Sequence, residues 1–195
     1  MRVRPGRTAL VACAIFVSFP STARSDVEAG RRKAELCAPC HGVASNSSVG
    51  FVPILAGQTA RYTYLELRDF KDGRREDPVM SPIAATLSRE DMLHLAEYYA
   101  AQTPGRTGFR ADPAKVAAGR AKAAEMLCTM CHLGGFSGQN EAPRLAGQHP
   151  EYVVKQLKAF KARSRTNDAG AMTSVAQLLS EEDIENLAAY IASLD

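Results

Sequence analysis

Two five-residue segments decide the fold of this chain: Cys37-Ala-Pro-Cys40-His41 and Cys128-Thr-Met-Cys131-His132. In each segment two cysteines lie three residues apart on one helical turn, and the histidine that follows lies on the same face. Such cysteines form thioethers with the two vinyl groups of haem, and the imidazole binds the iron. The sequence therefore predicts two covalently bound haem c groups. Their attachment residues are Cys37, Cys40, Cys128 and Cys131, and their first iron ligands are His41 and His132.

A single Cys-x-x-Cys pair has other interpretations, namely a redox dithiol or one half of a zinc site. The histidine directly after each pair argues against both, and the occurrence of two such segments makes chance improbable. A zinc or dithiol protein stays as the non-haem alternative.

Residues 1–25 have the layout of a cleaved secretory signal peptide. Three arginines precede an apolar run from Ala9 to Phe19, and small residues follow it. The run is about half the ~20 residues that a membrane-spanning helix needs, so a retained anchor is disfavoured. Cleavage after Ser25 is preferred to cleavage after Ala23. We expect export to the periplasm.

Removal of this segment changes both the cysteine count and the charge. Cys13 lies within it, in a stretch that only superficially resembles a lipoprotein cleavage site, so the four remaining cysteines all belong to the two haem segments. Residues 26–195 carry 20 basic and 21 acidic side chains. This balance gives no support to nucleic-acid binding.

The chain is an internal duplication with a register of 90 to 92 residues. Pro53–Gln58 is repeated at Pro143–Gln148, and Leu87–Asp91 is repeated at Leu179–Asp183. We therefore expect two domains, residues 26–103 and 114–195, joined by a turn-rich linker at 104–113.

Local patterns predict an all-α fold, and no segment of any length alternates as a strand does. Apolar residues recur with helical period at about 60–71 and 151–162. Candidate helix starts are a capping box from Ser25 to Glu28, Asp112 followed by Pro113, and Ser88 and Ser180 before the last helix of each half. Those last helices carry the apolar stripes Met92, Leu95, Ala96 and Tyr99, and Ile184, Leu187, Ala188 and Ile191.

The second ligand of each iron is predicted from the repeat. Met80 and Met172 lie 39 and 40 residues beyond the two haem histidines, in what we expect to be loops before the last helix. Because His/Met is an established pairing at c-type haem, they are the predicted second iron ligands. Met92 corresponds to Ile184 and is expected to pack in a core.

The other two histidines do not recur. His94 corresponds to Asn186 and His149 to Thr59, so neither belongs to the duplicated chemistry. We expect His94 on a helix surface and His149 in a loop. Each half has about 80 residues, which is marginal for a core of side chains alone, so haem is expected to be needed for folding.

Together these motifs resemble the dihaem cytochrome c4 family over essentially all of residues 26–195. The resemblance implies two tandem class I cytochrome c domains related by pseudo-twofold symmetry, with haems facing each other across the interface. It implies that the carbonyls of Pro53 and Pro143 accept the Nδ1–H of the haem histidines. It also implies an electron carrier, not an enzyme, that works between a quinol-oxidising complex and a terminal oxidase or reductase, with peripheral membrane association as an option.

Two other functions are compatible with parts of the pattern. The dihaem subunit of a flavocytochrome c sulfide dehydrogenase resembles the same repeat, although this chain contains no flavin-binding segment. A dihaem peroxidase would need one accessible iron, whereas both halves offer a methionine.

The two halves of the chain also differ: Gly42 follows the first haem histidine and Leu133 the second. This difference predicts unequal haem potentials.

Overall fold

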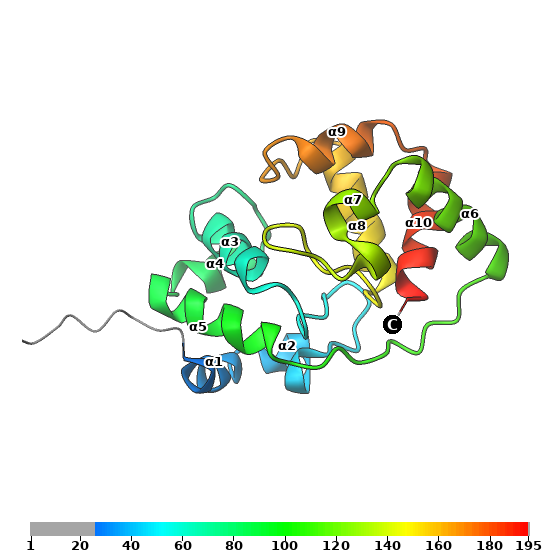
Figure 1. Cartoon of the computed structure of the whole chain (residues 1–195). Helices are drawn as coiled ribbons and strands as arrows, with labels where there is room; N and C mark the ends of the chain where they lie inside the picture. Colours follow the sequence, from blue (N-terminus) through cyan, green and yellow to red (C-terminus); the bar gives the residue numbers. More distant parts are fainter. Residues whose placement is uncertain (1–25, 195) are drawn as a thin grey trace, which may run out of the picture.

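The computed structural model describes residues 26–194, so the expected signal peptide at 1–25 lies outside the described residues. Two groups of five α-helices repeat along the chain, and each group contains one short 3-10 turn (Figure 1). The first group comprises α1 (Val27–Ala34), α2 (Ala38–His41), α3 (Ala60–Lys71), α4 (Met80–Ala85) and α5 (Arg89–Ala100). The second comprises α6 (Pro113–Glu125), α7 (Thr129–His132), α8 (Pro150–Lys161), α9 (Ala171–Gln177) and α10 (Glu181–Ala192).

This architecture confirms the predicted all-α fold. Within residues 26–194 the extended structure is limited to an isolated bridge between Gln139 and Ala142. Residues 103–112 connect the two groups without helical structure, along the expected linker. In the described part of the chain, no helix is both long and apolar enough to cross a membrane.

Most predicted helix starts are confirmed, and one is shifted. Ser88 and Ser180 each form a complete capping box with the aspartate three residues later. Asp112 caps α6 through the Ala114 amide, with proline at the first helical position. The first helix is different: its cap is Asp26, whose carboxylate accepts the Glu28 amide, so the capping box predicted from Ser25 was wrong. Asp26 follows Ser25 directly and has an extended backbone, so its carboxylate can accept from the free amides at the start of the helix in place of the serine.

The first and last helices of each half cross at a glycine. A Cβ atom on Gly30 of α1 would lie 2.1 Å from the His94 carbonyl oxygen, and one on Gly119 of α6 would lie 2.0 Å from that of Asn186. Any side chain at these positions would collide with the backbone of the opposite helix. Helix packing therefore requires glycine at both of these positions.

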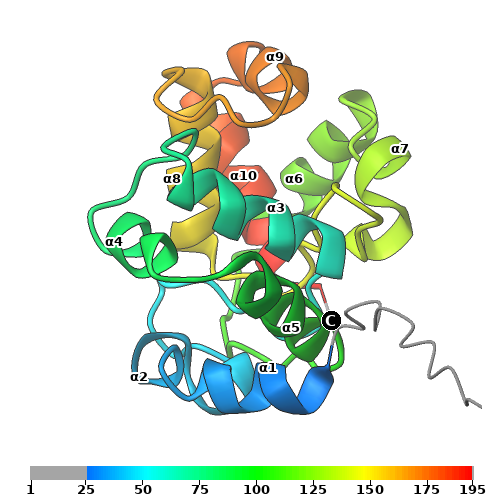
Figure 2. The same cartoon turned by 90° about the vertical axis from the view of Figure 1, so that its left-hand side faces the viewer.

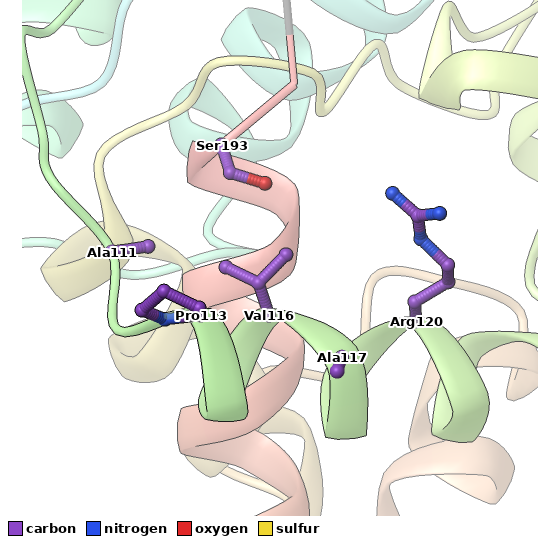
Figure 3. Close-up of a pocket in the computed structure, with 6 residues that line it drawn as sticks. All are labelled: Ala111, Pro113, Val116, Ala117, Arg120 and Ser193. Carbon is purple, nitrogen blue, oxygen red and sulfur yellow. The ribbon is translucent and has the colours of Figure 1, made fainter.

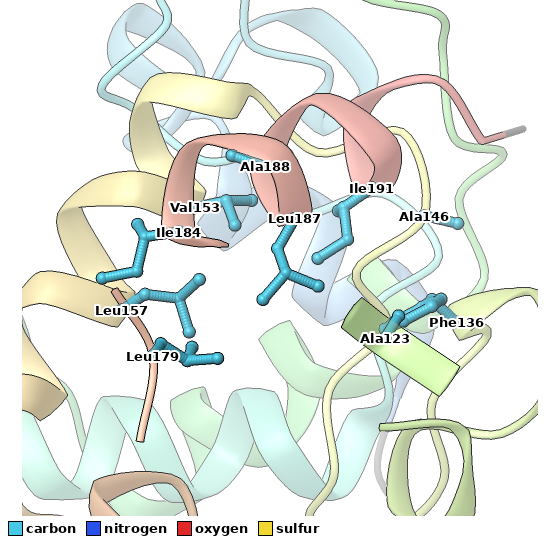
Figure 4. Packing of buried hydrophobic residues seen from close by; sticks show 10 residues of the cluster. All are labelled: Ala123, Phe136, Ala146, Val153, Leu157, Leu179, Ile184, Leu187, Ala188 and Ile191. Carbon is cyan, nitrogen blue, oxygen red and sulfur yellow. The ribbon is translucent and has the colours of Figure 1, made fainter. Parts of the chain in front are cut away.

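Each half has its own apolar core. The second is the larger, and it gathers side chains from α6, α8 and α10 together with Phe136, which is 1% exposed (Figure 4). The first gathers side chains of α1, α3 and α5, including Met92, which is buried as expected. The apolar stripes predicted for the two last helices are all buried in these cores.

The two halves join through a reciprocal pair of glutamines. Gln58 donates to the Arg144 carbonyl (2.9 Å) and accepts the Arg144 amide (2.7 Å). Gln148 makes the same two bonds to Ile54, at 3.0 and 2.9 Å. Because Arg144 and Ile54 are equivalent positions of the repeat, these four bonds follow the pseudo-twofold symmetry, and the halves pack side by side (Figure 2).

A second set of interface contacts breaks that symmetry. Arg75 of the first half and Arg165 of the second are equivalent residues, and both bind the carboxylate of Glu66, at 2.5 and 2.6 Å. The counterpart of Glu66 is Gln156, which accepts from both guanidinium groups at 2.9 and 2.7 Å. Tyr62 and Tyr152 complete the cluster through their hydroxyls. One carboxylate thus provides the counter-charge shared by two arginines from opposite halves.

Replacement of Glu66 tests the contribution of this cluster to stability. Its removal leaves two buried guanidinium groups without a counter-charge, and loss of one partner of a buried ion pair costs about 3–5 kcal/mol. We expect Glu66→Ala to lower the free energy of unfolding by that amount in denaturant titrations. The exposed Lys115–Glu185 pair is the control, because Glu185→Ala should cost less than about 1 kcal/mol. Equal effects of the two substitutions would contradict the prediction.

Candidate haem-binding sites

Each predicted haem segment forms one short helical turn that exposes its second cysteine. The His41 amide donates to the Cys37 carbonyl at 2.9 Å, and the His132 amide donates to that of Cys128 at 3.0 Å. In the described chain all four cysteines are free; the first of each pair is partly buried and the second is exposed. The turn therefore presents two thiols and an imidazole together, as thioether attachment requires.

The two histidines are buried and held by one hydrogen bond each. His41 Nδ1 lies 3.0 Å from the Pro53 carbonyl oxygen, and His132 Nδ1 lies 2.9 Å from that of Pro143. This arrangement is the one that the family resemblance implied. Burial lowers the pKa of both imidazoles, against the opposing effect of the proline carbonyls. The rings are therefore neutral near pH 7, with Nδ1 as the donor and Nε2 available to a metal.

The two methionines begin helices, so the prediction of loops was wrong. Met80 is the first residue of α4, and Met172 is the second residue of α9. An aspartate three or four residues earlier stabilises each turn: Asp77 accepts the Met80 amide at 3.1 Å, and Asp168 accepts the Thr173 amide at 2.5 Å. These short-range hydrogen bonds from backbone amides to a carboxylate favour helix where the sequence suggested a loop.

The fold brings each methionine to the core that its haem segment also contacts. Met80 and Cys37 both pack against the apolar core of the first half, and Met172 and Cys128 both pack against that of the second. The predicted members of each ligand set thus belong to one half of the molecule. His/Met coordination stays a prediction.

The unmatched histidines lie elsewhere. His94 is on α5, where its side chain is largely buried near the crossing with α1. His149 precedes α8, and it is buried at the interface, where its Nε2 lies 2.9 Å from the Ser47 carbonyl oxygen. His149 lies in a loop as expected, at the contact between the halves, whereas the expectation of a helix surface for His94 was wrong, because only 14% of that side chain is exposed.

Two further observations fit a bound haem. Tyr99 carries a buried hydroxyl without a hydrogen-bond partner, at the edge of the first site. Large apolar side chains are also exposed close to both haem segments and both methionines, where a macrocycle would cover them. They are Leu36, Val43, Val79 and Ile83 in the first half, and Leu127, Met130, Leu133 and Leu178 in the second.

No alternative metal site competes with this arrangement in residues 26–194. No three His, Cys, Asp or Glu side chains there gather around a common point. The pocket shown in Figure 3 lies away from the haem segments, between α6 and the end of α10. Its lining is mainly apolar and comprises Ala111, Pro113, Val116, Ala117, Arg120 and Ser193.

The fold and the two sites define a c-type cytochrome with two domains. Comparison with known proteins agrees: the cytochrome c family model matches residues 116–195. Cytochrome c4 of Pseudomonas aeruginosa is 40% identical over 88% of this chain and 90% of its own length. The crystal structure of reduced cytochrome c4 from Pseudomonas stutzeri superposes with a TM-score of 0.82, at 35% identity, over 88% of this chain and all of that one.

Other relatives have names that refer to thiosulfate oxidation. The thiosulfate dehydrogenase electron acceptor of Stutzerimonas stutzeri is 33% identical over 81% of this chain and 78% of its own length. The thiosulfate dehydrogenase TsdBA of Marichromatium purpuratum has a TM-score of 0.77 at 32% identity, covering 87% of this chain and 40% of that one. The chain belongs to the cytochrome c4 family, and its cofactors are two covalently bound haem c groups.

Sequence reasoning missed the residues that join the domains. The glutamine ending each Pro-x-Leu-Ala-Gly-Gln segment was recognised as part of the repeat but not as an interface residue. Arg75 and Arg165 have the same spacing of 90 residues, and this recurrence was the available signal. Lysine also recurs at the equivalent positions 71 and 161. The ammonium groups of Lys71 and Lys161 donate to the carbonyls of Leu87 and Leu179, just before the last helix of each half.

The backbone after the second haem histidine is strained. Gly42 has φ +80° and ψ 163°, and the equivalent Leu133 has φ +60° and ψ 171°. This region suits glycine and costs a residue with a Cβ atom of order 1–3 kcal/mol. The turn at Gly42 is therefore unstrained, whereas the equivalent turn at Leu133 is strained.

Leu133→Gly should relieve this strain. Because the native backbone already has the glycine conformation, we expect stability to rise by about 1 kcal/mol, the strain relief being partly offset by greater chain entropy and a lost side-chain contact. Thermal unfolding of the haem-loaded protein measures the change. Gly42→Leu is the matched reverse substitution and should destabilise the first half, because its Cβ atom would lie 2.2 Å from the Asn46 carbonyl oxygen. A stability decrease for Leu133→Gly would refute the strain argument.

Proposed function

We propose that this protein is a periplasmic electron carrier that accepts electrons from a quinol-oxidising complex and delivers them to a terminal oxidase or reductase. Its cytochrome c4 relatives support electron transfer, and the leader-like residues 1–25 support export. The observation that carries the proposal is the duplication of a complete ligand set. It comprises Cys37, Cys40, His41 and Met80 in the first half, and Cys128, Cys131, His132 and Met172 in the second.

Bound haem supplies an iron centre that takes up and releases one electron. The chain's own residues orient the iron ligands and tune the reduction potential. A neutral imidazole held by a proline carbonyl has a fixed ring orientation and a more basic Nε2. A thioether as the second ligand favours the reduced iron and raises the potential. Two protein ligands leave no position for a substrate, so we infer transfer without turnover.

The rigid interface supports electron passage between the halves. Four glutamine–backbone bonds and the Glu66 cluster bind the two domains at several points. Fixed domains keep the distance between the two redox centres constant. A two-electron carrier of this kind can accept electrons at one half and deliver them from the other.

A second candidate role is electron acceptance from a sulfur-oxidising enzyme. The names of two relatives favour thiosulfate dehydrogenase as the donor, and we retain the flavocytochrome c sulfide dehydrogenase subunit within the same class. In both cases the catalytic centre belongs to another protein or domain. The TsdBA match is consistent with this, because this chain covers only 40% of that longer protein.

Substitution of each methionine tests the ligand assignment. We expect Met80→Ala and Met172→Ala each to remove roughly half of the near-infrared methionine-to-iron charge-transfer band, because each opens one of two sites. Each should also lower one reduction potential and leave the other nearly unchanged. Met92→Leu is the control, since Met92 packs in the core and should leave the band intact. An unchanged spectrum in either alanine variant would refute the assignment for that site.

Reduction kinetics with purified donors separate the two roles. The oxidised protein is mixed in a stopped-flow instrument with a quinol-oxidising bc-type complex plus quinol, and separately with thiosulfate dehydrogenase plus thiosulfate. We expect the first mixture to reduce both haems at least tenfold faster at equal concentrations. Faster reduction by thiosulfate dehydrogenase would instead support the second role. Omission of quinol or thiosulfate provides the blank for each.

A further inference from the structure

Tyr99 has an unusual position in the first half. It lies on α5, its side chain is 3% exposed, and its ring packs beside that of Tyr98 with centroids 5.4 Å apart. Its hydroxyl oxygen is the one buried side-chain N or O atom without a hydrogen-bond partner in residues 26–194. A buried polar group left unpaired costs free energy, so this hydroxyl requires an acceptor that the haem-free chain does not present to it.

The surroundings of the hydroxyl point to the haem site. Tyr99 belongs to the core of the first half, and the partly buried residues against that core include Cys37 and Met80. Burial first, and then the Cys37 thiol, raise the pKa of Tyr99 above its ordinary value. Tyr99 therefore stays protonated and acts as a hydrogen-bond donor at the attachment edge of the first site.

The second half has no such group. The Tyr99 carbonyl accepts the Gly57 amide at 2.9 Å, and the Ile191 carbonyl accepts the Gly147 amide at 3.0 Å, so Tyr99 and Ile191 are equivalent residues. Ile191 is buried in the second core and has no polar atom in its side chain. The position that carries a polar hydroxyl in the first half thus carries a hydrocarbon side chain in the second.

We propose that Tyr99 is a positioning residue of the first haem site, and that its hydroxyl donates a hydrogen bond to the Cys37 sulfur once that sulfur is bound to haem. The inference rests on the proposed attachment through Cys37. Donation to the sulfur withdraws electron density from the edge of the macrocycle, which favours the reduced iron. Tyr99 therefore raises the potential of the first haem and leaves the second unaffected.

Tyr99→Phe in the exported, haem-loaded protein is the direct test, because phenylalanine preserves the ring and removes only the hydroxyl. Intact mass first establishes that two haems are attached, so a failure of attachment is distinguished from a failure of this proposal. Spectroelectrochemical titration then gives both potentials. We expect one potential to decrease and the other to stay within error. In a Met172→Ala background the second haem is displaced to low potential, which identifies the responsive haem as the first.

Two further variants complete the design. Tyr98→Phe removes the neighbouring hydroxyl and should change neither potential, which controls for loss of a tyrosine on α5. Tyr99→Ile copies the second half and should lower the same potential as Tyr99→Phe. Unchanged potentials in Tyr99→Phe overturn the proposal, and a simultaneous rise in thermal midpoint would show that the hydroxyl is unpaired in the holoprotein. Equal shifts of both potentials also overturn it, because they indicate a global effect.

Discussion

The constraint on which this structure depends is the small size of each half. About 80 residues bury too little apolar surface to be stable on side chains alone, so we expect each domain to depend on its covalently held haem to complete the core. This requirement explains why large apolar residues such as Leu36 and Leu127 stay exposed in the polypeptide. It also explains why the helices cross at glycines: Gly30 and Gly119 bring two helices close together, so a short chain can enclose a large planar group.

The interface between the domains follows from the same constraint. Two small domains gain stability by burying a shared surface, but a surface made from a duplicated sequence brings like charges together near the pseudo-twofold axis, where a residue lies close to its own counterpart. Arg75 and Arg165 illustrate the problem, because both are buried near the symmetry axis. A glutamate at one of the two equivalent positions, Glu66, and a glutamine at the other, Gln156, provide one negative charge for both. Two glutamates would add a second buried carboxylate to the same small volume, at a further desolvation cost.

Sequence reasoning predicted most of the fold, because its strongest signals are local or repeated. Capping at Ser88 and Asp112 and the stripe around Leu95 depend on neighbouring residues, so they are visible without coordinates. The helical start at Met80 was missed because the carboxylate of Asp77 stabilises a turn that has little propensity of its own. The interface was missed for a different reason. Its contacts join residues 77 to 103 positions apart, and repetition alone does not show which repeated residues meet each other.

The departures from symmetry are concentrated where they can affect the haems. Duplication would give two equivalent sites, yet Gly42 is replaced by Leu133, Tyr99 by Ile191 and Glu66 by Gln156. The first two pairs lie beside a haem ligand or attachment residue, and the third lies between the domains. The glutamine contacts, the proline–histidine bonds and the helix crossings are by contrast the same in both halves. The shared contacts fix the geometry of electron transfer, and the unshared ones change the local polarity and strain at each centre.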